Sequence, residues 1–194
     1  MVADIQAKEI TLPLTKQDVL NLNAGDTVLI NGLLVTGRDR VHKFLFHERP
    51  PKEDLPFPEG TILYHAGPII SGNRVIAAGP TTSIRVEMYE PWVIEHYGIR
   101  GIMGKGGMGT KTLEAMKKFG CVYLNTIGGA ASYLADRIKG IIGGFKVEEF
   151  GAAEAMWLLE VEDFPAVVTM DAHGKSLHEE IEKLSLENLQ KLLK

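Results

Sequence analysis

The sequence predicts an α/β domain with a mixed sheet and flanking helices. Three observations lead to this fold class. Short apolar runs typical of strands fill the first part of the chain, strand-like and helix-like segments alternate in the middle, and strand patterns return before an amphipathic tail. Alternation of this kind is typical of layered α/β domains, and the strand-rich flanks favour mixed strand directions. Because no repeat, low-complexity stretch or linker divides the 194 residues, we expect one domain over 1–194.

The first half of the chain is expected to be rich in strands, at 9–14, 27–35, 61–64 and 75–78. Val41, Phe44 and Leu45 recur at helical spacing behind an acid that favours a first helical turn, so 39–48 is predicted as a helix. Four prolines then follow within a few residues, and they predict an irregular exposed loop.

The second half is expected to alternate helices with strands. Helices are predicted at 84–97 (kinked or restarted at Pro91), 110–119 and 130–139, and strands at 99–103, 121–125, 141–150, 156–161 and 166–170. The tail from Ser176 is amphipathic, and Ser176 with Glu179 fits a capping box. We expect this tail to pack on its own domain as a helix; a helix that binds a partner is the alternative.

Composition limits the classes of function. The net charge of −4 and the absence of a basic tract argue against nucleic-acid binding. No apolar run approaches the roughly 20 residues of a membrane span, and the N-terminus has no signal pattern, so a cytoplasmic protein is expected. Cys121 is the one cysteine. It cannot form an internal disulfide or hold an iron–sulfur cluster, which needs several cysteines, so we interpret it as a buried structural residue.

Two polar segments fall where a predicted strand meets a predicted helix. In 36–42, Arg38 could bind a carboxylate through two parallel hydrogen bonds, or it could be a surface residue. In 78–85, the hydroxyls from Thr81 onward could cap the helix, or together with Arg85 they could form an anion site at the helix N-terminus.

A third such segment, 101–110, carries Gly104, Gly106 and Gly109 in dinucleotide-binding spacing. The motif comes after half the chain, however, and the following strand ends in Asn125 rather than in an acid for the ribose. We therefore interpret it as a glycine loop that presents Lys105 to an anionic ligand, with nucleotide binding as the alternative.

These three strand-to-helix junctions, called corners below, are 36–42, 78–85 and 101–110. Together they carry Arg38, Thr81, Arg85 and Lys105. Three cations and a hydroxyl suit a small dianion such as a dicarboxylate. The histidines His42, His65 and His173 share no metal-ligand spacing, so no metal site is predicted. No Gly-x-Ser-x-Gly elbow is present, which argues against a serine hydrolase of that type.

Nearly the whole chain resembles the C-terminal regions of class I fumarases and the β-subunits of L-tartrate dehydratases. The stretches that carry the resemblance are 36–42, 63–68, 78–85, 102–108, 128–131 and 148–151. The resemblance implies a swivelling β/β/α-type domain, the β-subunit of a two-subunit hydro-lyase. It also implies a [4Fe–4S] cluster held by the α-subunit and not by this chain, in an assembly expected to be α₂β₂.

The same resemblance implies site roles. Arg38, Arg85 and Lys105 match the family's substrate-binding residues, Thr81 matches its catalytic threonine, and His42 is expected to be structural. The implied reaction is the reversible hydration of fumarate to L-malate, in the tricarboxylic acid cycle. Tartrate dehydration is the close alternative, and a nucleotide-binding protein or a dicarboxylate-binding module acting alone are the distant ones.

Overall fold

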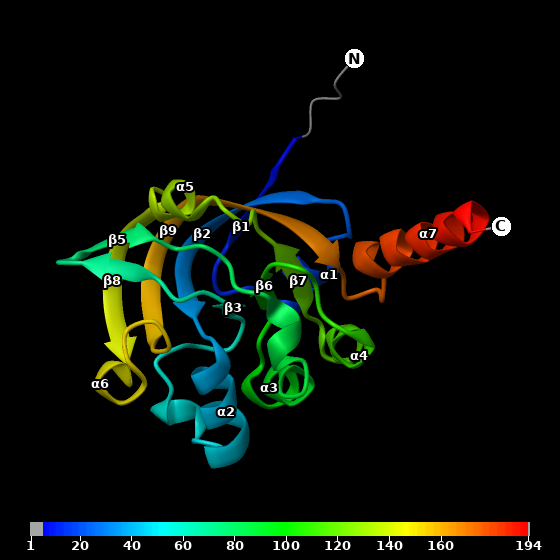
Figure 1. Cartoon of the computed structure of the whole chain (residues 1–194). Helices are drawn as coiled ribbons and strands as arrows, with labels where there is room; N and C mark the ends of the chain where they lie inside the picture. Colours follow the sequence, from blue (N-terminus) through cyan, green and yellow to red (C-terminus); the bar gives the residue numbers. More distant parts are fainter. Residues whose placement is uncertain (1–5, 194) are drawn as a thin grey trace.

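The computed structural model describes residues 6–193, and its main feature is a seven-stranded mixed sheet (Figure 1). The strand order is β1-β2-β3-β6-β7-β9-β8, and β9 also pairs with β2. Strands β2, β3, β6, β7 and β9 therefore form a closed ring. The neighbours from β1 to β7 run parallel, whereas β9 is antiparallel to β2, β7 and β8. The predicted α/β class with a mixed sheet is confirmed. The strands are β1 (Lys8–Thr11), β2 (Thr27–Thr36), β3 (Ile62–Tyr64), β6 (Gly101–Gly104), β7 (Val122–Asn125), β8 (Ile138–Phe145) and β9 (Met156–Met170).

Two hydrophobic clusters line the two faces of these strands. Along β3, for example, Leu63 belongs to one cluster, whereas Ile62 and Tyr64 belong to the other. This alternation is what a strand buried on both faces requires, because successive side chains point to opposite sides. The first of these clusters packs under α2 (Asp39–Glu48), α3 (Glu90–Tyr97) and α4 (Thr110–Phe119), which lie together on one side of the sheet (Figure 1).

The helices predicted at 39–48 and 110–119 are confirmed with the same bounds. Each buries one face against the sheet, and α4 ends at Gly120, whose left-handed backbone suits a glycine. The helix predicted at 84–97 is two elements, a 3₁₀ turn η2 (Ser83–Val86) and α3. Pro91 lies in the first turn of α3, where a missing N–H costs little, so it marks a helix start rather than a kink.

The segment after residue 130 differs most from expectation. The predicted helix 130–139 is only α5 (Ala131–Ala135), and the strand predicted at 141–150 is β8 followed by the short helix α6 (Val147–Phe150). The two strands predicted at 156–161 and 166–170 are one strand, β9. Pro165, which lies just before the second predicted strand, pairs with Leu29 in the register with β2.

Some short elements were not predicted. They are α1 (Lys16–Leu20), the 3₁₀ turn η1 (Lys52–Asp54) within the proline-rich loop, and β4 (Ile69–Ser71). Strand β4 forms a hairpin with β5 (Arg74–Ala77), which is the strand predicted at 75–78. Helix α1 is too short for a periodic pattern, but its capping box between Thr15 and Asp18 was visible in the sequence.

The tail forms α7 (Leu177–Leu192), which begins at Ser176 as predicted, with the hydroxyl of Ser176 accepting from the amide of Glu179. It does not pack along its domain as expected. The helix extends away from the sheet (Figure 1), no described residue of it is buried, and Ile181 and Leu192 are 66% and 84% exposed. No helix within residues 6–193 is long and apolar enough to cross a membrane.

Candidate functional site

Backbone hydrogen bonds join two of the three predicted corners, and an ion pair joins the third. The amide of Lys105 donates to the carbonyl of Thr81 (3.1 Å), and the amide of Ser83 donates to the carbonyl of Lys105 (3.0 Å). The segment from Thr81 to Ser83 therefore runs alongside the end of β6, and the Thr81 backbone lies next to that of Lys105. An ion pair between Arg85 and Asp39 then links this segment to the start of α2.

Arg38 is the N-cap residue of α2, directly after β2, and its side chain is half-buried. Its guanidinium lies 3.3 Å from the carboxylate of Glu154 and donates to the carbonyl of Ala153 at 3.5 Å. A Cβ at Gly67 would lie 2.7 Å from the Nη1 atom of Arg38, so only glycine permits this approach. The Nε–H of Arg38 is buried and has no acceptor among the described residues. The backbone around Arg38 thus fixes the position of its guanidinium.

Thr81 lies at the centre of the site and is half-buried. Its amide and its hydroxyl both donate to the carbonyl of His65, at 2.7 Å and 2.9 Å. These two hydrogen bonds fix the rotamer of the Thr81 side chain. They leave the lone pairs of its hydroxyl oxygen free to accept a hydrogen bond.

Arg85 is the most exposed of the predicted arginines, and it pairs with Asp39 through two nitrogens. Partial burial alone would raise the pKa of Asp39, but the hydrogen bond and charge of Arg85 outweigh it, and the pKa lies below its ordinary value. Asp39 therefore stays ionised and keeps Arg85 close to Arg38, which directly precedes Asp39 in the chain.

Lys105 is exposed on the glycine loop after β6. Gly106 and Gly107 both have left-handed backbones, with φ of 85° and 76°, which explains why the loop is glycine-rich. Among residues 6–193, no carboxylate forms an ion pair with the Lys105 ammonium. It is the member of the set whose charge is most available to an anion.

The glycine fingerprint has a structural explanation that does not involve a nucleotide. A Cβ at Gly104 would lie 2.1 Å from the Ser83 hydroxyl, and one at Gly109 would lie 2.7 Å from the Glu87 carboxylate. Glu87 also accepts from the amides of Gly109 (2.8 Å) and Thr112 (3.1 Å) at the start of α4. The position where a pyrophosphate would bind the helix N-terminus is therefore filled by a carboxylate of the chain itself.

The structure also brings together a buried group that the sequence did not predict. His42, His65 and Glu90 come from α2, from the residue after β3 and from α3, and all three are at most 2% exposed. The Nε2 atoms of His42 and His65 lie 2.9 Å and 3.2 Å from the same carboxylate oxygen of Glu90. Burial alone would raise the pKa of Glu90, but the two imidazoles lower it from 4.5 to about 2.

This group contacts the predicted site directly. The Nδ1–H of His42 donates to the carbonyl of Arg38 (2.7 Å), and Nδ1 of His65 lies 2.9 Å from the hydroxyl of Ser83. Ser83 in turn bonds the phenol of Tyr123 at 2.8 Å. Two imidazoles and a carboxylate are also common zinc ligands, and their possible ligand atoms lie within 4.8 Å of one another. Sequence spacing could not reveal the group, because its members are 23 and 25 residues apart on separate elements.

Cys121 is buried as predicted, and burial raises the pKa of its thiol. A lone thiol in the core cannot serve as the ligand set of an iron–sulfur cluster, so no cluster can be held by cysteines of this chain.

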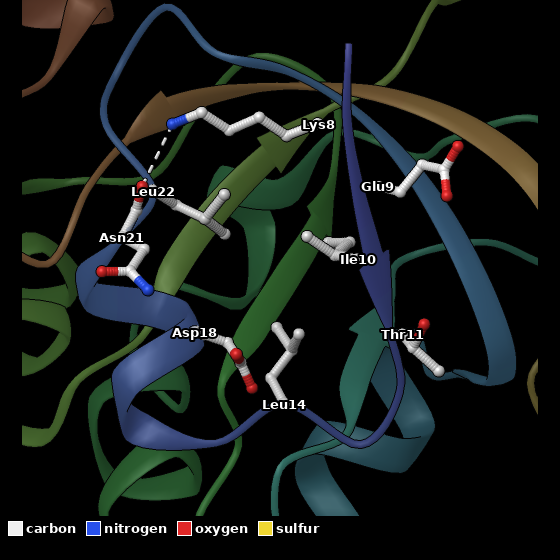
Figure 2. Close-up of a pocket in the computed structure, with 8 residues that line it drawn as sticks. All are labelled: Lys8, Glu9, Ile10, Thr11, Leu14, Asp18, Asn21 and Leu22. Atoms are coloured by element: carbon white, nitrogen blue, oxygen red, sulfur yellow. Dashed lines mark hydrogen bonds between the residues drawn. The ribbon is translucent and has the colours of Figure 1, made fainter.

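A separate hollow lies between β1 and α1 (Figure 2) and contains none of the predicted site residues. Figure 2 shows Ile10, Leu14 and Leu22 pointing into it, and the ammonium of Lys8 at its rim bonds the carbonyl of Asn21 (3.1 Å). Lys8, the one cation lining the hollow, also pairs with Asp26, and the acids Glu9 and Asp18 lie beside it. A hollow with one cation and two acids does not suit a dianion as well as the corner around Thr81.

The chain is an α/β domain in which cationic and hydroxyl side chains gather after the carboxyl ends of parallel strands. Residues 2–181 match the family described as Fumarase C-terminus. A Geobacillus stearothermophilus protein, provisionally named fumarate hydratase class I, is 53% identical over 96% of this chain, which spans only 37% of that relative. The chain belongs to the Fumarase C-terminus family, and the resemblance noted from its motifs is confirmed.

Two further relatives match over almost their whole length. A Methanocaldococcus jannaschii protein, provisionally named L(+)-tartrate dehydratase subunit beta, is 40% identical over 93% of this chain and 95% of its own. The L(+)-tartrate dehydratase subunit beta of Escherichia coli K12 is 36% identical over 93% of this chain and 90% of its own. The names of all three relatives denote hydro-lyases, and they do not separate fumarate from tartrate as the substrate.

Proposed function

We propose that the chain is the substrate-binding β-subunit of an iron–sulfur hydro-lyase that acts on a small dicarboxylate, with fumarate and L-malate as the leading pair. The observation that carries the proposal is the meeting of Thr81, Lys105 and Arg85 at one corner, linked through Asp39 to Arg38. L-tartrate is the alternative substrate, favoured by the names of the two relatives that match over most of their length.

The cations of this chain would hold the carboxylates of the substrate. Arg38 and Arg85 offer planar forks that match a carboxylate, and Lys105 adds a mobile point charge. As the C–H next to a carboxylate loses its proton, negative charge grows on that carboxylate, and fixed cations stabilise it. The same cations favour loss of the Thr81 hydroxyl proton to solvent, and the resulting negatively charged oxygen would accept the substrate's proton and become a neutral hydroxyl again.

The other half of the chemistry would come from a partner subunit. A [4Fe–4S] cluster held by an α-subunit would supply a Lewis acid for the departing hydroxyl group. Exposed apolar side chains next to the corner support a covered face: Ile84, Met88 and Ile127 are 49%, 71% and 64% exposed. Side chains of this kind at a site rim are typical of an interface. An α₂β₂ assembly and a cytoplasmic location remain predictions.

The nucleotide alternative has a separate expectation. Because Glu87 occupies the amides at the start of α4, the chain should not bind NAD measurably in calorimetry. Submillimolar binding of NAD would revive that alternative.

An anaerobic assay tests the proposal. The chain is combined with a cluster-loaded α-subunit from the same genome, and malate, fumarate and L-tartrate are offered to each subunit alone and to the pair. We expect turnover only with both chains, and the preferred substrate decides between the two hydro-lyases. A loaded partner that binds this chain without any turnover would contradict the proposal.

A further inference from the structure

The buried group of His42, His65 and Glu90 has a defined proton count. The carbonyl of Arg38 can only accept, so Nδ1 of His42 carries a hydrogen. If Nε2 of His42 carried none, the ionised Glu90 carboxylate 2.9 Å away would be buried with no positive charge beside it, which is strongly unfavourable. His42 is therefore an imidazolium, and its positive charge balances Glu90.

His65 has the opposite character. Burial lowers its pKa more than Glu90 raises it, so the ring is neutral. Its Nε2 faces the same carboxylate at 3.2 Å and must carry the hydrogen, which leaves Nδ1 to accept from the Ser83 hydroxyl. Burial raises the pKa of the Tyr123 phenol, so Tyr123 remains protonated and donates to Ser83. Hydrogen bonds therefore run from Tyr123 through Ser83 to His65, whose Nε2 lies close to Glu90 without an aligned hydrogen bond.

The two imidazoles tie Glu90 to the candidate site by different routes. His65 supplies the carbonyl that holds both the amide and the hydroxyl of Thr81. His42 holds the carbonyl of Arg38, one turn earlier in α2. Gly104 lets the end of β6 approach Ser83, because a Cβ there would lie 2.1 Å from the hydroxyl. The Glu90 carboxylate thus helps to fix the segments around Arg38 and Thr81, which are far apart in the sequence.

We infer that Glu90 is a positioning residue for the dicarboxylate site: its buried carboxylate, shared by His42 and His65, sets the placement of Thr81 relative to Arg38. The inference rests on the proposed function and deepens it. Neither ring N–H is aligned with the carboxylate oxygen: the charged His42 makes an ion-pair contact with Glu90, and the neutral His65 makes a charge–dipole contact. Charge therefore holds the group together more than hydrogen-bond direction does.

Kinetics of the assembled two-subunit enzyme test the role. Glu90→Gln keeps the shape and removes the charge, and it should lower kcat by about 10- to 100-fold, since a displacement near 1 Å can cost about 100-fold. KM should change much less, because the guanidinium of Arg38 has its own contacts with Ala153 and Glu154. Glu90→Asp, which retains the carboxylate, should recover part of kcat.

Tyr97→Phe is the matched control. Tyr97 lies on the same helix and is buried, and its phenol donates to the carbonyls of Leu45 and Pro50, both at 3.2 Å, away from the group. It should lower stability while leaving kcat unchanged. Wild-type kcat in Glu90→Gln, or an equal loss in Tyr97→Phe, would overturn the positioning role.

Nitrogen-15 NMR of histidine side chains in the full-length chain gives a readout that does not depend on activity. We expect His42 to carry hydrogens on both nitrogens at pH 7, His65 to carry one on Nε2, and Glu90→Gln to make His42 neutral. A neutral His42 in the wild type would overturn the inference, as would one equivalent of zinc in the purified chain by mass spectrometry, because a metal would then hold the three side chains. Inactivity of the wild-type pair would refute the proposed function, and the positioning role with it. This outcome is distinct from the NMR and zinc results, which are measured without any activity assay.

Discussion

The two arginines of the site differ in how they are held. Arg38 is half-buried, its guanidinium lies between Gly67 and Ala153, and Glu154 pairs with it. Arg85 is exposed and is held by Asp39 alone. A fixed guanidinium loses little conformational entropy when a carboxylate binds, whereas an exposed one loses more. Arg38 is therefore expected to set the orientation of the substrate.

Arg38→Lys should raise KM for the dicarboxylate by about tenfold or more, because lysine cannot reproduce the planar fork and a charged hydrogen bond contributes about 1.5–3 kcal/mol. Steady-state kinetics of the assembled enzyme measure this. Arg40→Lys is the matched control, since the guanidinium of Arg40 bonds the carbonyls of Glu149 and Phe150 instead. An unchanged KM in Arg38→Lys would remove Arg38 from the substrate site.

Gly104→Ala should destabilise the chain by about 1–3 kcal/mol, the range of an overpacked core, because its Cβ would collide with the Ser83 hydroxyl. Urea unfolding measures the change. Gly143→Ala has nothing within 4 Å of its Cβ and should be close to neutral. If both variants were equally stable, the close approach of β6 to Ser83 would be wrong.

Single residues were predictable where position alone carried the signal. Arg38, Thr81 and Lys105 each follow a strand and precede a helix or helical turn, and Arg85 lies in the turn η2 that follows Thr81, so the corner pattern in the sequence was enough to single them out. Their assignment to substrate binding and proton transfer remains a proposal. His65 and Glu90 carry no such signal, because their contact depends on the packing of α3 against the residues after β3.

Hydrophobic periodicity predicted the helices that bury one apolar face against the sheet. It did not predict the extent of β9 or the exposure of the tail helix. Helices α2 and α4 have one apolar stripe each and were predicted at their observed bounds. The segment 156–170 was predicted as two strands, 156–161 and 166–170, yet pairing with β2 keeps β9 continuous through Pro165. The tail was expected to pack on the domain, but its apolar side chains stay exposed, which periodicity alone cannot foresee.

The packing of α2 against α3 through His42 and Glu90 has a pH dependence with a definite sign. The pKa of Glu90 is lowered from 4.5 to about 2, so its contribution to stability is complete above pH 4.5 and is lost as pH falls toward 2. In Glu90→Gln the buried His42 is neutral and gains a proton on unfolding, so this variant loses stability as pH falls below about 6.5, whereas the Glu90–His42 contribution in the wild type is intact down to about pH 4.5. The gap between the two free energies of unfolding should therefore widen as pH falls from about 7 to about 4.5. Urea titrations at several pH values measure the gap, and a constant gap over this range would contradict the assigned ionisation.

For the whole molecule, the account requires a partner over the corner that carries Thr81. Ile84 and Met88 flank Arg85 beside a shallow hollow that also includes Gly109 and Thr110. These apolar side chains, and not the hollow between β1 and α1, mark the face that should be covered.

Met88→Glu should weaken association with the α-subunit by about tenfold or more, because burying an unpaired charge in an interface costs several kcal/mol. Calorimetry or analytical ultracentrifugation measures the affinity. Leu20→Glu, a substitution at a 37% exposed residue of α1, is the control and should bind normally. Equal affinities for all three forms would place the interface elsewhere.

The central claim is that this chain brings Thr81 into an active site completed by another subunit. Turnover of L-malate, or of L-tartrate if that is preferred, by the assembled enzyme tests it most directly when Thr81→Ala is compared with Thr82→Ala, its exposed neighbour. Thr81→Ala should still bind the partner and lose turnover by a factor of about 100 or more, while Thr82→Ala should retain it. Normal turnover in Thr81→Ala would contradict the account.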